Sequence, residues 1–344
     1  MAQIGIIGGG TWGIALASLV HENGHQVTVW SAFEKDAKYL RENRVQKNLP
    51  DLILPADMEF TADMETALKD KDLVVTVVPS IYIRETARKM APFVRDGQIV
   101  VNASKGIEAE TLDFLSEILE EELPNADIAV LSGPSHAEEV SRSLPTTCVA
   151  GAKSRKTAEY IQSIFMSPVF RVYTSSDITG IEIGGALKNV IALAAGIADG
   201  LGYGDNTKAA LITRGISEIS RLGVAMGGKP ETFGGLTGIG DLIVTCASMH
   251  SRNRRAGILI GKGYSMEEAM AEVKMVVEGV YSAKAGLALA KKYEISMPII
   301  TAVNEVLFDG RPAGEAVQDL MLRDRTVESP AIGWELFYWE YLAW

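Results

Sequence analysis

Short apolar runs alternate with helical patterns through the first half of the chain. Residues 4–7 and 27–30 are rich in β-branched side chains, which is typical of strands buried on both faces. Similar runs at residues 72–78, 98–102 and 128–131 are separated by stretches whose apolar positions recur at helical spacing. This alternation predicts an α/β fold with a doubly wound, mostly parallel sheet, whose ligands bind beyond the carboxyl ends of the strands.

The pattern changes near residue 176, after which helical spacing continues without strand-like runs. We therefore expect a first domain of residues 1–176 and an all-α second domain of residues 177–344. Residues 178–201 are apolar enough to suggest a membrane span. Polar side chains interrupt that stretch at Glu182, Lys188, Asn189 and Asp199. We expect a buried helix without membrane insertion. The small residues expected to pack it closely are Gly184, Gly185, Ala192 and Ala195.

Two local predictions concern the connections of the first half. The prolines of residues 49–55 favour a loop there. Ser135 and Glu138 have the S-x-x-E spacing of a capping box, which predicts a helix start and would by itself explain both residues.

Net charge limits the classes of ligand that the chain can bind. The 344 residues include 33 Lys and Arg against 44 Asp and Glu, a formal net charge of −11. This field repels polyanions, so we expect neither nucleic acid nor an anionic membrane as a partner. Cys148 and Cys246 have no metal-ligand spacing and suit a reducing compartment, so we expect no metal site. The N-terminus shows no signal-sequence pattern, and we expect a cytoplasmic protein.

A glycine-rich turn follows the first strand. Gly8, Gly10 and Gly13 have the G-x-G-x-x-G spacing, in which the first glycine permits a tight turn and the second lets the backbone approach a pyrophosphate. The third lets the next helix pack against the strand, and that helix offers free N–H groups and the positive end of its dipole. Strand, turn, helix and second strand together predict a dinucleotide site.

Three other places carry candidate chemistry. Lys105 follows the fourth predicted strand, where it either reaches the ligand cleft or lies solvated at the surface. Lys188 lies inside an apolar helix, where it either has a function or extends along its methylene stem to water. Ser251 is expected to cap a helix whose first turn holds Arg252 and Asn253. That turn is either a phosphate site or a solvated helix start.

Seven motifs follow one another along the chain. They are Gly8-x-Gly10-Thr11-Trp12-Gly13, Ser104-Lys105-Gly106, Gly133-Pro134-Ser135, Lys188-Asn189, Gly204-Asp205-Asn206-Thr207-Lys208-Ala209-Ala210, Leu236-Thr237-Gly238-Ile239-Gly240-Asp241-Leu242 and Ser251-Arg252-Asn253-Arg254. In this order and spacing they resemble the NAD(P)-dependent glycerol-3-phosphate dehydrogenases of the bacterial type. The resemblance implies a Rossmann-type domain followed by an all-α C-terminal domain. It also implies interconversion of sn-glycerol 3-phosphate and dihydroxyacetone phosphate with NAD or NADP, feeding phospholipid synthesis.

The resemblance further implies roles for individual residues. Lys188 would be the general acid/base, with Lys105 lowering its pKa and Asp241 holding it in place. The substrate pocket would be lined by Lys105, Gly133, Ser135, Lys188, Asp241, Ser251, Arg252 and Asn253. The cofactor would be bound by Gly8, Gly10, Thr11, Trp12, Gly13, Lys105, Ala137, Arg252, Val276 and Glu278.

Two stretches depart from the family pattern. Ser31-Ala32-Phe33 follows the second strand where many members carry basic residues, which predicts that NADH is used at least as well as NADPH unless Lys35 supplies the missing charge. The aromatic tail at residues 332–344 is expected to dock on this subunit or on a partner. We expect a homodimer.

Two other functions remain open at this level. A related two-domain hydroxyacid dehydrogenase would need a carboxylate pocket in place of a phosphate pocket. A redox sensor that binds NAD(P)H without turnover would have no use for Lys188 inside an apolar helix.

Overall fold

The computed structural model describes residues 1–325, 327 and 328, so the aromatic tail lies outside the described residues. The strands are β1 (Gln3–Ile7), β2 (Gln26–Trp30), β3 (Val45–Gln46), β4 (Leu49–Ile53), β5 (Glu59–Thr61), β6 (Leu73–Thr76), β7 (Ile99–Asn102), β8 (Asp127–Ser132), β9 (Thr146–Ala152) and β10 (Phe170–Ser175). The helices among them are α1 (Thr11–Glu22), α2 (Glu34–Asn43), α3 (Met64–Leu68), the 3-10 turn η1 (Ser80–Tyr82), α4 (Ile83–Met90), α5 (Leu115–Glu122), α6 (Ala137–Val140) and α7 (Arg155–Phe165).

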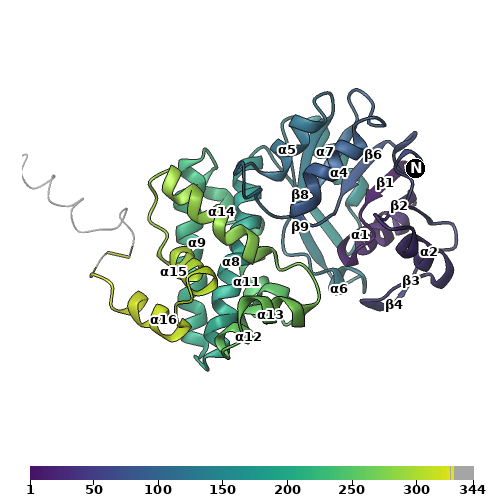
Figure 1. Cartoon of the computed structure of the whole chain (residues 1–344). Helices are drawn as coiled ribbons and strands as arrows, with labels where there is room; N and C mark the ends of the chain where they lie inside the picture. The colour runs from purple at the N-terminus through teal and green to yellow at the C-terminus, as the bar shows by residue number, and fades with distance from the viewer. Residues whose placement is uncertain (326, 329–344) are drawn as a thin grey trace, which may run out of the picture.

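The second half is helical. Its elements are α8 (Ile178–Gly200), α9 (Asp205–Ala225), α10 (Pro230–Phe233), the π-helical turn η2 (Leu236–Gly240), α11 (Asp241–Ala247), α12 (Arg252–Gly261), α13 (Met266–Val273), α14 (Glu278–Lys292), α15 (Pro298–Phe308) and α16 (Ala313–Met321). Figure 1 shows this helical half beside the half that contains the sheet.

The sheet of the first half has eight strands in the order β10-β9-β8-β7-β6-β1-β2-β5. β1 pairs in parallel with both β2 and β6, so that Ile4 lies opposite Val27 and Leu73. β8 and β9 pair antiparallel. Because the chain continues to β2 on one side of β1 and later to β6 on the other, the carboxyl end of β1 is a switch point, where such sheets bind ligands. The predicted doubly wound, mostly parallel sheet is confirmed.

Helices cover both faces of this sheet (Figure 1). Ile14 of α1 and Ile161 of α7 share an apolar core with Ile6 on one face. Ile83 of α4 packs with Ile7 in a second core on the other face. Consecutive side chains of a strand point to opposite faces, so a sheet covered on both sides requires unbroken apolar runs, as the sequence has.

α8 lies at the centre of the helical half. It is long and apolar enough to cross a membrane, but its apolar stretch is entirely buried inside the protein. A Cβ on Gly196 would overlap the backbone carbonyl of Arg254, and one on Gly257 would overlap that of Leu193. α8 and α12 therefore touch backbone to backbone, and the expected buried helix is confirmed.

The close contacts of α8 differ in part from those predicted. Gly184 does allow a close approach, since a Cβ there would lie 2.7 Å from the carbonyl oxygen of Thr237. Gly185 faces the Lys105 side chain and Ser132, and a Cβ there would lie 3.3 Å from Oγ of Ser132 and 3.5 Å from Cγ of Lys105. The sequence analysis did not single out Gly196, which brings α12 against the helix.

Two local predictions were wrong. The expected loop at residues 49–55 contains β4, which pairs antiparallel with the two-residue β3, and so short a hairpin has no recognisable alternation. Ser135 does not cap α6, because that helix begins at Ala137 with His136 in the N-cap position. The Ser135 hydroxyl instead donates to the carbonyl oxygen of Gly133 at 3.0 Å, which keeps it in the loop after β8.

Candidate active site

The glycine turn after β1 has the shape of a phosphate cradle. Gly8 has a φ of +134°, and a Cβ there would lie 2.6 Å from the carbonyl oxygen of Val77. A Cβ on Gly13 would overlap the carbonyl of Gly8, so the helix can approach the strand only without one. A Cβ on Gly10 would meet no heavy atom of the described residues within 4 Å. Gly10 is also the N-cap of α1, so open space lies beside the free N–H groups of a helix start, which fits a pyrophosphate.

Thr11 and Trp12 connect this turn to its surroundings. Nε1 of Trp12 donates to the carbonyl oxygen of Ala103 at 3.2 Å, in the loop after β7. Oγ1 of Thr11 accepts from Nδ2 of Asn48 at 3.2 Å, at the tip of the β3–β4 hairpin. The two predicted cofactor residues therefore lie between the Lys105 loop and the hairpin.

The segment after β2 carries no cation of its own. Ser31 is buried against Gly9, while Phe33 exposes 62% of its surface. Nζ of Lys35 lies 5.4 Å from the centre of the Phe33 ring, so this cation is placed on an aromatic side chain. The guanidinium of Arg41, further along α2, is paired with Glu34.

Lys188, Asp241 and Thr245 form a buried cluster. Nζ of Lys188 binds Oδ1 of Asp241 and lies 2.8 Å from Oγ1 of Thr245, one turn further along α11. Nζ of Lys105 lies 2.6 Å from the other carboxylate oxygen of Asp241 and 3.1 Å from the carbonyl oxygen of Gly133. Lys188 exposes 6% of its surface, so it does not extend to water. One carboxylate therefore holds two ammonium groups, one from each half of the chain.

This arrangement shifts the pKa values of Lys188 and Asp241. Burial lowers the pKa of Lys188 to about 7, an effect that Asp241 opposes and Lys105 reinforces. Burial raises the pKa of Asp241, but the ammonium groups of Lys105 and Lys188 outweigh it and hold that pKa below its usual value. Lys188 can thus gain or lose a proton near neutral pH, as a general acid/base must.

The start of α12 is fixed by its own polar residues. Oγ of Ser251 accepts from the backbone N–H of Arg254 at 3.2 Å, so the predicted N-cap is confirmed. Nδ2 of Asn253 donates to Oδ1 of Asn189 at 2.9 Å, and Oδ1 of Asn253 accepts from the N–H of Gly279 at 2.8 Å. Asn253 therefore ties α12 to α8 and α14.

Arg252 is an available cation in the first turn of this helix. The guanidinium of Arg254 is paired with Asp199 at 2.7 Å. Arg252 is half-buried, forms no ion pair with any other residue that the structure describes, and has its pKa lowered by burial, which Glu278 and Glu138 oppose. A desolvated guanidinium in the first turn of a helix is suited to a phosphate group.

Glu278 and Ser80 join the two halves of the chain near the cofactor turn. The carboxylate of Glu278, at the start of α14, accepts from the N–H of Ser80 at 3.1 Å and from its hydroxyl. Burial raises the pKa of Glu278, although Ser80 and Arg252 oppose the shift. Val276 lies half-buried just before Glu278, and Ala137 is buried at the start of α6.

Sequence reasoning missed three polar side chains that contact the predicted site residues. Thr245 lies four residues after Asp241, so a helical reading of that stretch could have found it on the same face. Asn189 is adjacent to Lys188 but was given no role. Ser80 lies just beyond an apolar run, and no sequence signal connects it with Glu278.

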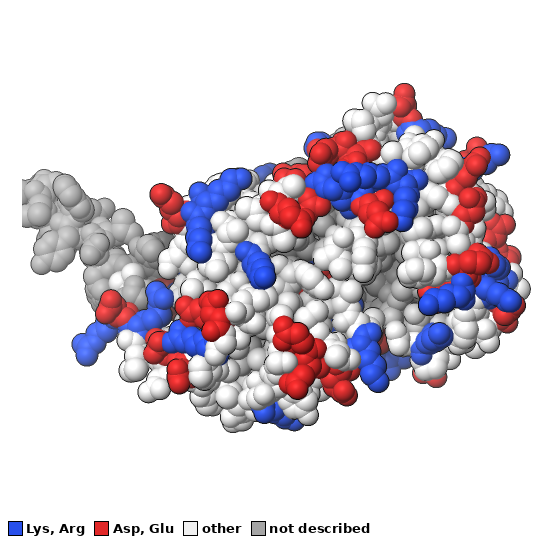
Figure 2. All heavy atoms as spheres, in the orientation of Figure 1, with Lys and Arg blue, Asp and Glu red and all other residues white. Residues whose placement is uncertain are grey.

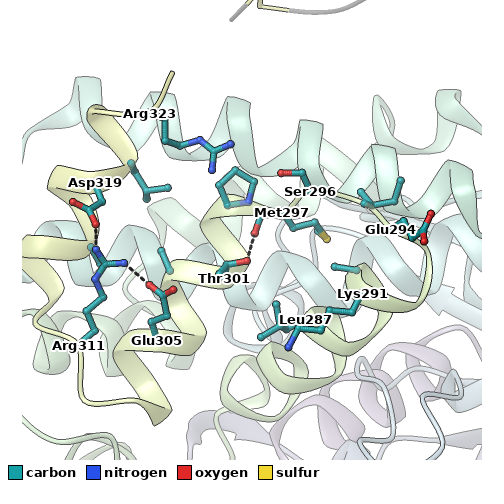
Figure 3. Close-up of a pocket in the computed structure, with 16 residues that line it drawn as sticks. Leu287, Lys291, Glu294, Ser296, Met297, Thr301, Glu305, Arg311, Asp319 and Arg323 are labelled. Carbon is teal, nitrogen blue, oxygen red and sulfur yellow. Dashed lines mark hydrogen bonds and ion pairs between the residues drawn. The ribbon is translucent and has the colours of Figure 1, made fainter. Parts of the chain in front are cut away.

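The hollow drawn in Figure 3 lies elsewhere, among α14, α15 and α16, with a volume of about 580 Å³. One of its two guanidinium groups, that of Arg311, is paired with Glu305 and Asp319. Its lining, which runs from Leu287 to Arg323, includes none of the predicted site residues. The candidate chemistry is therefore not in this hollow.

The surface and the cysteines add two observations. Figure 2 shows acidic and basic side chains interspersed over the face that it draws. Cys148 and Cys246 are both free and buried. Within the part of the chain that the structure describes, no group of three or more His, Cys, Asp or Glu is placed to hold a metal ion.

Comparisons with known proteins match both halves of the chain. The models of the NAD-dependent glycerol-3-phosphate dehydrogenase N-terminus and C-terminus match residues 3–158 and 177–318. A glycerol-3-phosphate dehydrogenase [NAD(P)+] of Agathobacter rectalis is 60% identical, with 97% of this chain and 100% of the relative covered. That of Bacillus subtilis is 52% identical, with 95% and 96% covered. The crystal structure of glycerol-3-phosphate dehydrogenase from Coxiella burnetii superposes with a TM-score of 0.90 at 35% identity, covering 94% of this chain and 99% of that one.

Proposed function

Because the chain belongs to the NAD-dependent glycerol-3-phosphate dehydrogenase family, we propose that Lys188 is its general acid/base, with Asp241 and Lys105 as charged partners. The chain interconverts sn-glycerol 3-phosphate and dihydroxyacetone phosphate, with NAD or NADP as the cofactor. The observation that carries the assignment is the buried Lys188 ammonium, held between Asp241 and Thr245 with its pKa lowered to about 7.

Reduction of the ketone requires a hydride at C2 and a proton on the C2 oxygen. The bound nicotinamide supplies the hydride. The Lys188 ammonium donates the proton, and Asp241 holds that ammonium in position. Lys105 keeps a second positive charge beside the oxygen on which negative charge develops. In the oxidation, neutral Lys188 accepts the proton of the C2 hydroxyl.

The remaining site residues bind the two substrates. Arg252, in the first turn of α12, binds the phosphate, as its half-buried guanidinium supports. The residues that line the substrate pocket with it are Lys105, Gly133, Ser135, Lys188, Asp241, Ser251 and Asn253. The residues that hold the cofactor are Gly8, Gly10, Thr11, Trp12, Gly13, Lys105, Ala137, Arg252, Val276 and Glu278.

The two directions of the reaction should depend on pH in opposite ways. Oxidation needs neutral Lys188, so its kcat/KM should rise as the pH passes upward through about 7. Reduction needs the ammonium form, so its kcat/KM should fall over the same range. The measurement is kcat/KM for each direction between about pH 6 and about pH 9 in one buffer system. Profiles that bend in the same direction would contradict the assignment of this pKa to the proton-transferring group.

NADH should serve at least as well as NADPH. The residues directly after β2 bring no free guanidinium for a 2′-phosphate, since Ser31 is buried, Lys35 lies over the Phe33 ring and Arg41 is paired with Glu34. The measurement is kcat/KM for each nucleotide with saturating dihydroxyacetone phosphate. A value for NADPH more than about tenfold above that for NADH would overturn this prediction. The loss of that preference in Lys35→Ala would then identify Lys35 as the 2′-phosphate ligand.

One assay separates this function from the alternatives. Oxidation of NADH with dihydroxyacetone phosphate, compared with oxidation by a 2-oxo carboxylic acid, distinguishes a phosphate pocket from a carboxylate pocket. A protein that binds NADH but turns over neither substrate would be a sensor. The matches to both halves of one enzyme family favour the phosphate substrate.

The wider setting follows from the reaction. The product sn-glycerol 3-phosphate supplies phospholipid synthesis in the cytoplasm, and the buried free thiols of Cys148 and Cys246 are compatible with a reducing compartment. Residues 1–176 form the dinucleotide-binding domain and residues 177–344 the substrate domain, a division supported by the end of the sheet at Ser175.

The chain acts as a homodimer, which sedimentation analysis tests. The apolar side chains exposed at the end of α16 are compatible with such a contact.

A further inference from the structure

Glu182 is a buried carboxylate that the proposed reaction leaves without a role. It lies six residues before Lys188 on α8, about 9 Å along the helix axis, and exposes 8% of its surface. Its Oε1 accepts from the backbone N–H of Ser116 at 3.1 Å, and its Oε2 accepts from the Ser116 hydroxyl. Its Oε1 also accepts from Nδ2 of Asn102 at 3.3 Å. These bonds join the helix of Lys188 to α5 and to the end of β7.

Asn102 carries this connection into the Lys105 loop. Its Oδ1 accepts from the N–H of Ser104 at 3.0 Å, and its Nδ2 donates to the carbonyl oxygen of Ser104 at 3.1 Å. Because a backbone N–H can only donate, the amide oxygen must face it, and Nδ2 must face Glu182. A single side chain therefore sets the backbone next to Lys105 and is itself oriented by the carboxylate on α8.

Lys105 and Lys188 meet on the two oxygens of one Asp241 carboxylate, so the loop and the helix must keep a fixed separation. The cofactor turn belongs to the same half of the chain as Lys105, and Trp12 also contacts the Lys105 loop through Ala103. A shift of α8 against that loop would therefore change the distance between the hydride donor and the proton donor. Displacements of about 1 Å in such geometry can lower a rate about 10²-fold.

We propose that Glu182 is a positioning residue for hydride transfer, which fixes the Lys105 loop of the first half against the helix that carries Lys188. The inference rests on the proposed roles of Lys188 and Lys105. It assigns Glu182 no contact with substrate or cofactor. It acts through Asn102 and through the start of α5.

The chain offers a matched control in Glu218. That carboxylate, on α9, is also buried, and it accepts from the backbone N–H groups of Ile299 and Ile300 at the start of α15. Burial raises the pKa of Glu182 and of Glu218 alike, to about 7 in each case. Both therefore stabilise a helix start from inside the protein, but Glu182 alone of the two bonds to Asn102, which holds the Lys105 loop.

The experiment compares Glu182→Gln with Glu218→Gln in the pre-steady-state oxidation of NADH by dihydroxyacetone phosphate, with both substrates in excess over the enzyme. The burst amplitude reports the competent fraction of enzyme, and the burst rate reports hydride transfer. For Glu182→Gln we expect a rate about 10- to 100-fold lower, with an unchanged amplitude and KM values within about twofold of the parent. For Glu218→Gln we expect an unchanged rate. A lower amplitude at the parental rate, or an equal loss of rate in both variants, would overturn the proposal.

A second variant tests the route through Asn102. Asn102→Ala should slow the burst, and the double variant with Glu182→Gln should be no slower than the slower single variant, because both changes weaken the same connection. Multiplying losses would show that the two residues act separately and would overturn the proposal. If Glu182→Gln does not fold, Asn102→Ala tests the proposal by itself. A parental burst rate in Asn102→Ala would overturn the proposal, and a slower burst at full amplitude would support it. A normal rate in Lys188→Met would refute the proposed acid/base role of Lys188 and would leave the comparison of the two glutamates intact.

Discussion

Lys188→Met is expected to lower kcat by a factor of about 10²–10⁴, the range for the loss of a general acid/base. Met preserves the length and the apolar stem of the side chain, so the variant should fold as well as the parent or better. Removing the buried charge leaves Asp241 paired with Lys105 at 2.6 Å, so no isolated carboxylate remains. The measurements are kcat in both directions, the melting temperature and the Kd for NADH. NADH binding should be retained because the cofactor turn lies in the other half of the chain.

Lys71→Met is the matched control for this variant. Lys71 is also a buried lysine, 7% exposed, and its Nζ donates to Oγ1 of Thr28 at 2.8 Å within the sheet. Burial lowers its pKa as well, but Lys71 bonds to a hydroxyl and lies away from the Asp241 cluster. We expect Lys71→Met to keep kcat. A folded Lys188→Met protein that retains more than about a tenth of the parental kcat would make Lys105 the next candidate for the acid/base.

Arg252→Ala is expected to raise the KM for dihydroxyacetone phosphate by a factor that corresponds to about 2–4 kcal/mol. The reason is that a desolvated guanidinium at a helix start makes a charge-assisted contact with the phosphate, and water does not replace it equally well. Arg252→Lys should lose less, because it keeps the charge but not the planar fork. The measurement is KM for the phosphate substrate at constant ionic strength.

Arg311→Ala provides the comparison for that change. Arg311 belongs to the same helical half, but its guanidinium is paired with Glu305 and Asp319 beside the hollow of Figure 3. Its removal should lower the melting temperature and leave KM within about twofold. An unchanged KM in Arg252→Ala would mean that the start of α12 is a solvated helix start and not a phosphate site.

The sequence by itself determined those features that depend on neighbouring residues. The spacing of Gly8, Gly10 and Gly13 after an apolar strand predicted the cofactor turn, because strand, turn and helix start are adjacent along the chain. Ser251 was predicted as an N-cap for the same reason, since the hydroxyl and the N–H that it accepts from lie three residues apart. The unbroken apolar runs predicted a sheet covered on both faces.

Where local patterns were short or ambiguous, the sequence misled. β4 pairs with a strand of two residues, which is too short to show any period, and it was expected to be a loop. Ser135 satisfied a capping pattern, but the chain around Gly133 starts the helix later and turns the hydroxyl back into the loop. A capping motif describes spacing only, whereas the direction of a hydroxyl depends on the backbone that precedes it.

Only the tertiary structure decided how the candidate site works. Lys105, Lys188 and Asp241 lie far apart along the chain, and no periodicity determines that both ammonium groups bind one carboxylate. The pKa of Lys188 depends on how much water its neighbours exclude and on the distance to each charge, which are properties of packed segments. The same holds for the bond between Glu182 and Asn102, which are 80 residues apart. Burial and charge separation arise when distant segments pack together, and that packing makes Lys188 able to exchange a proton near pH 7.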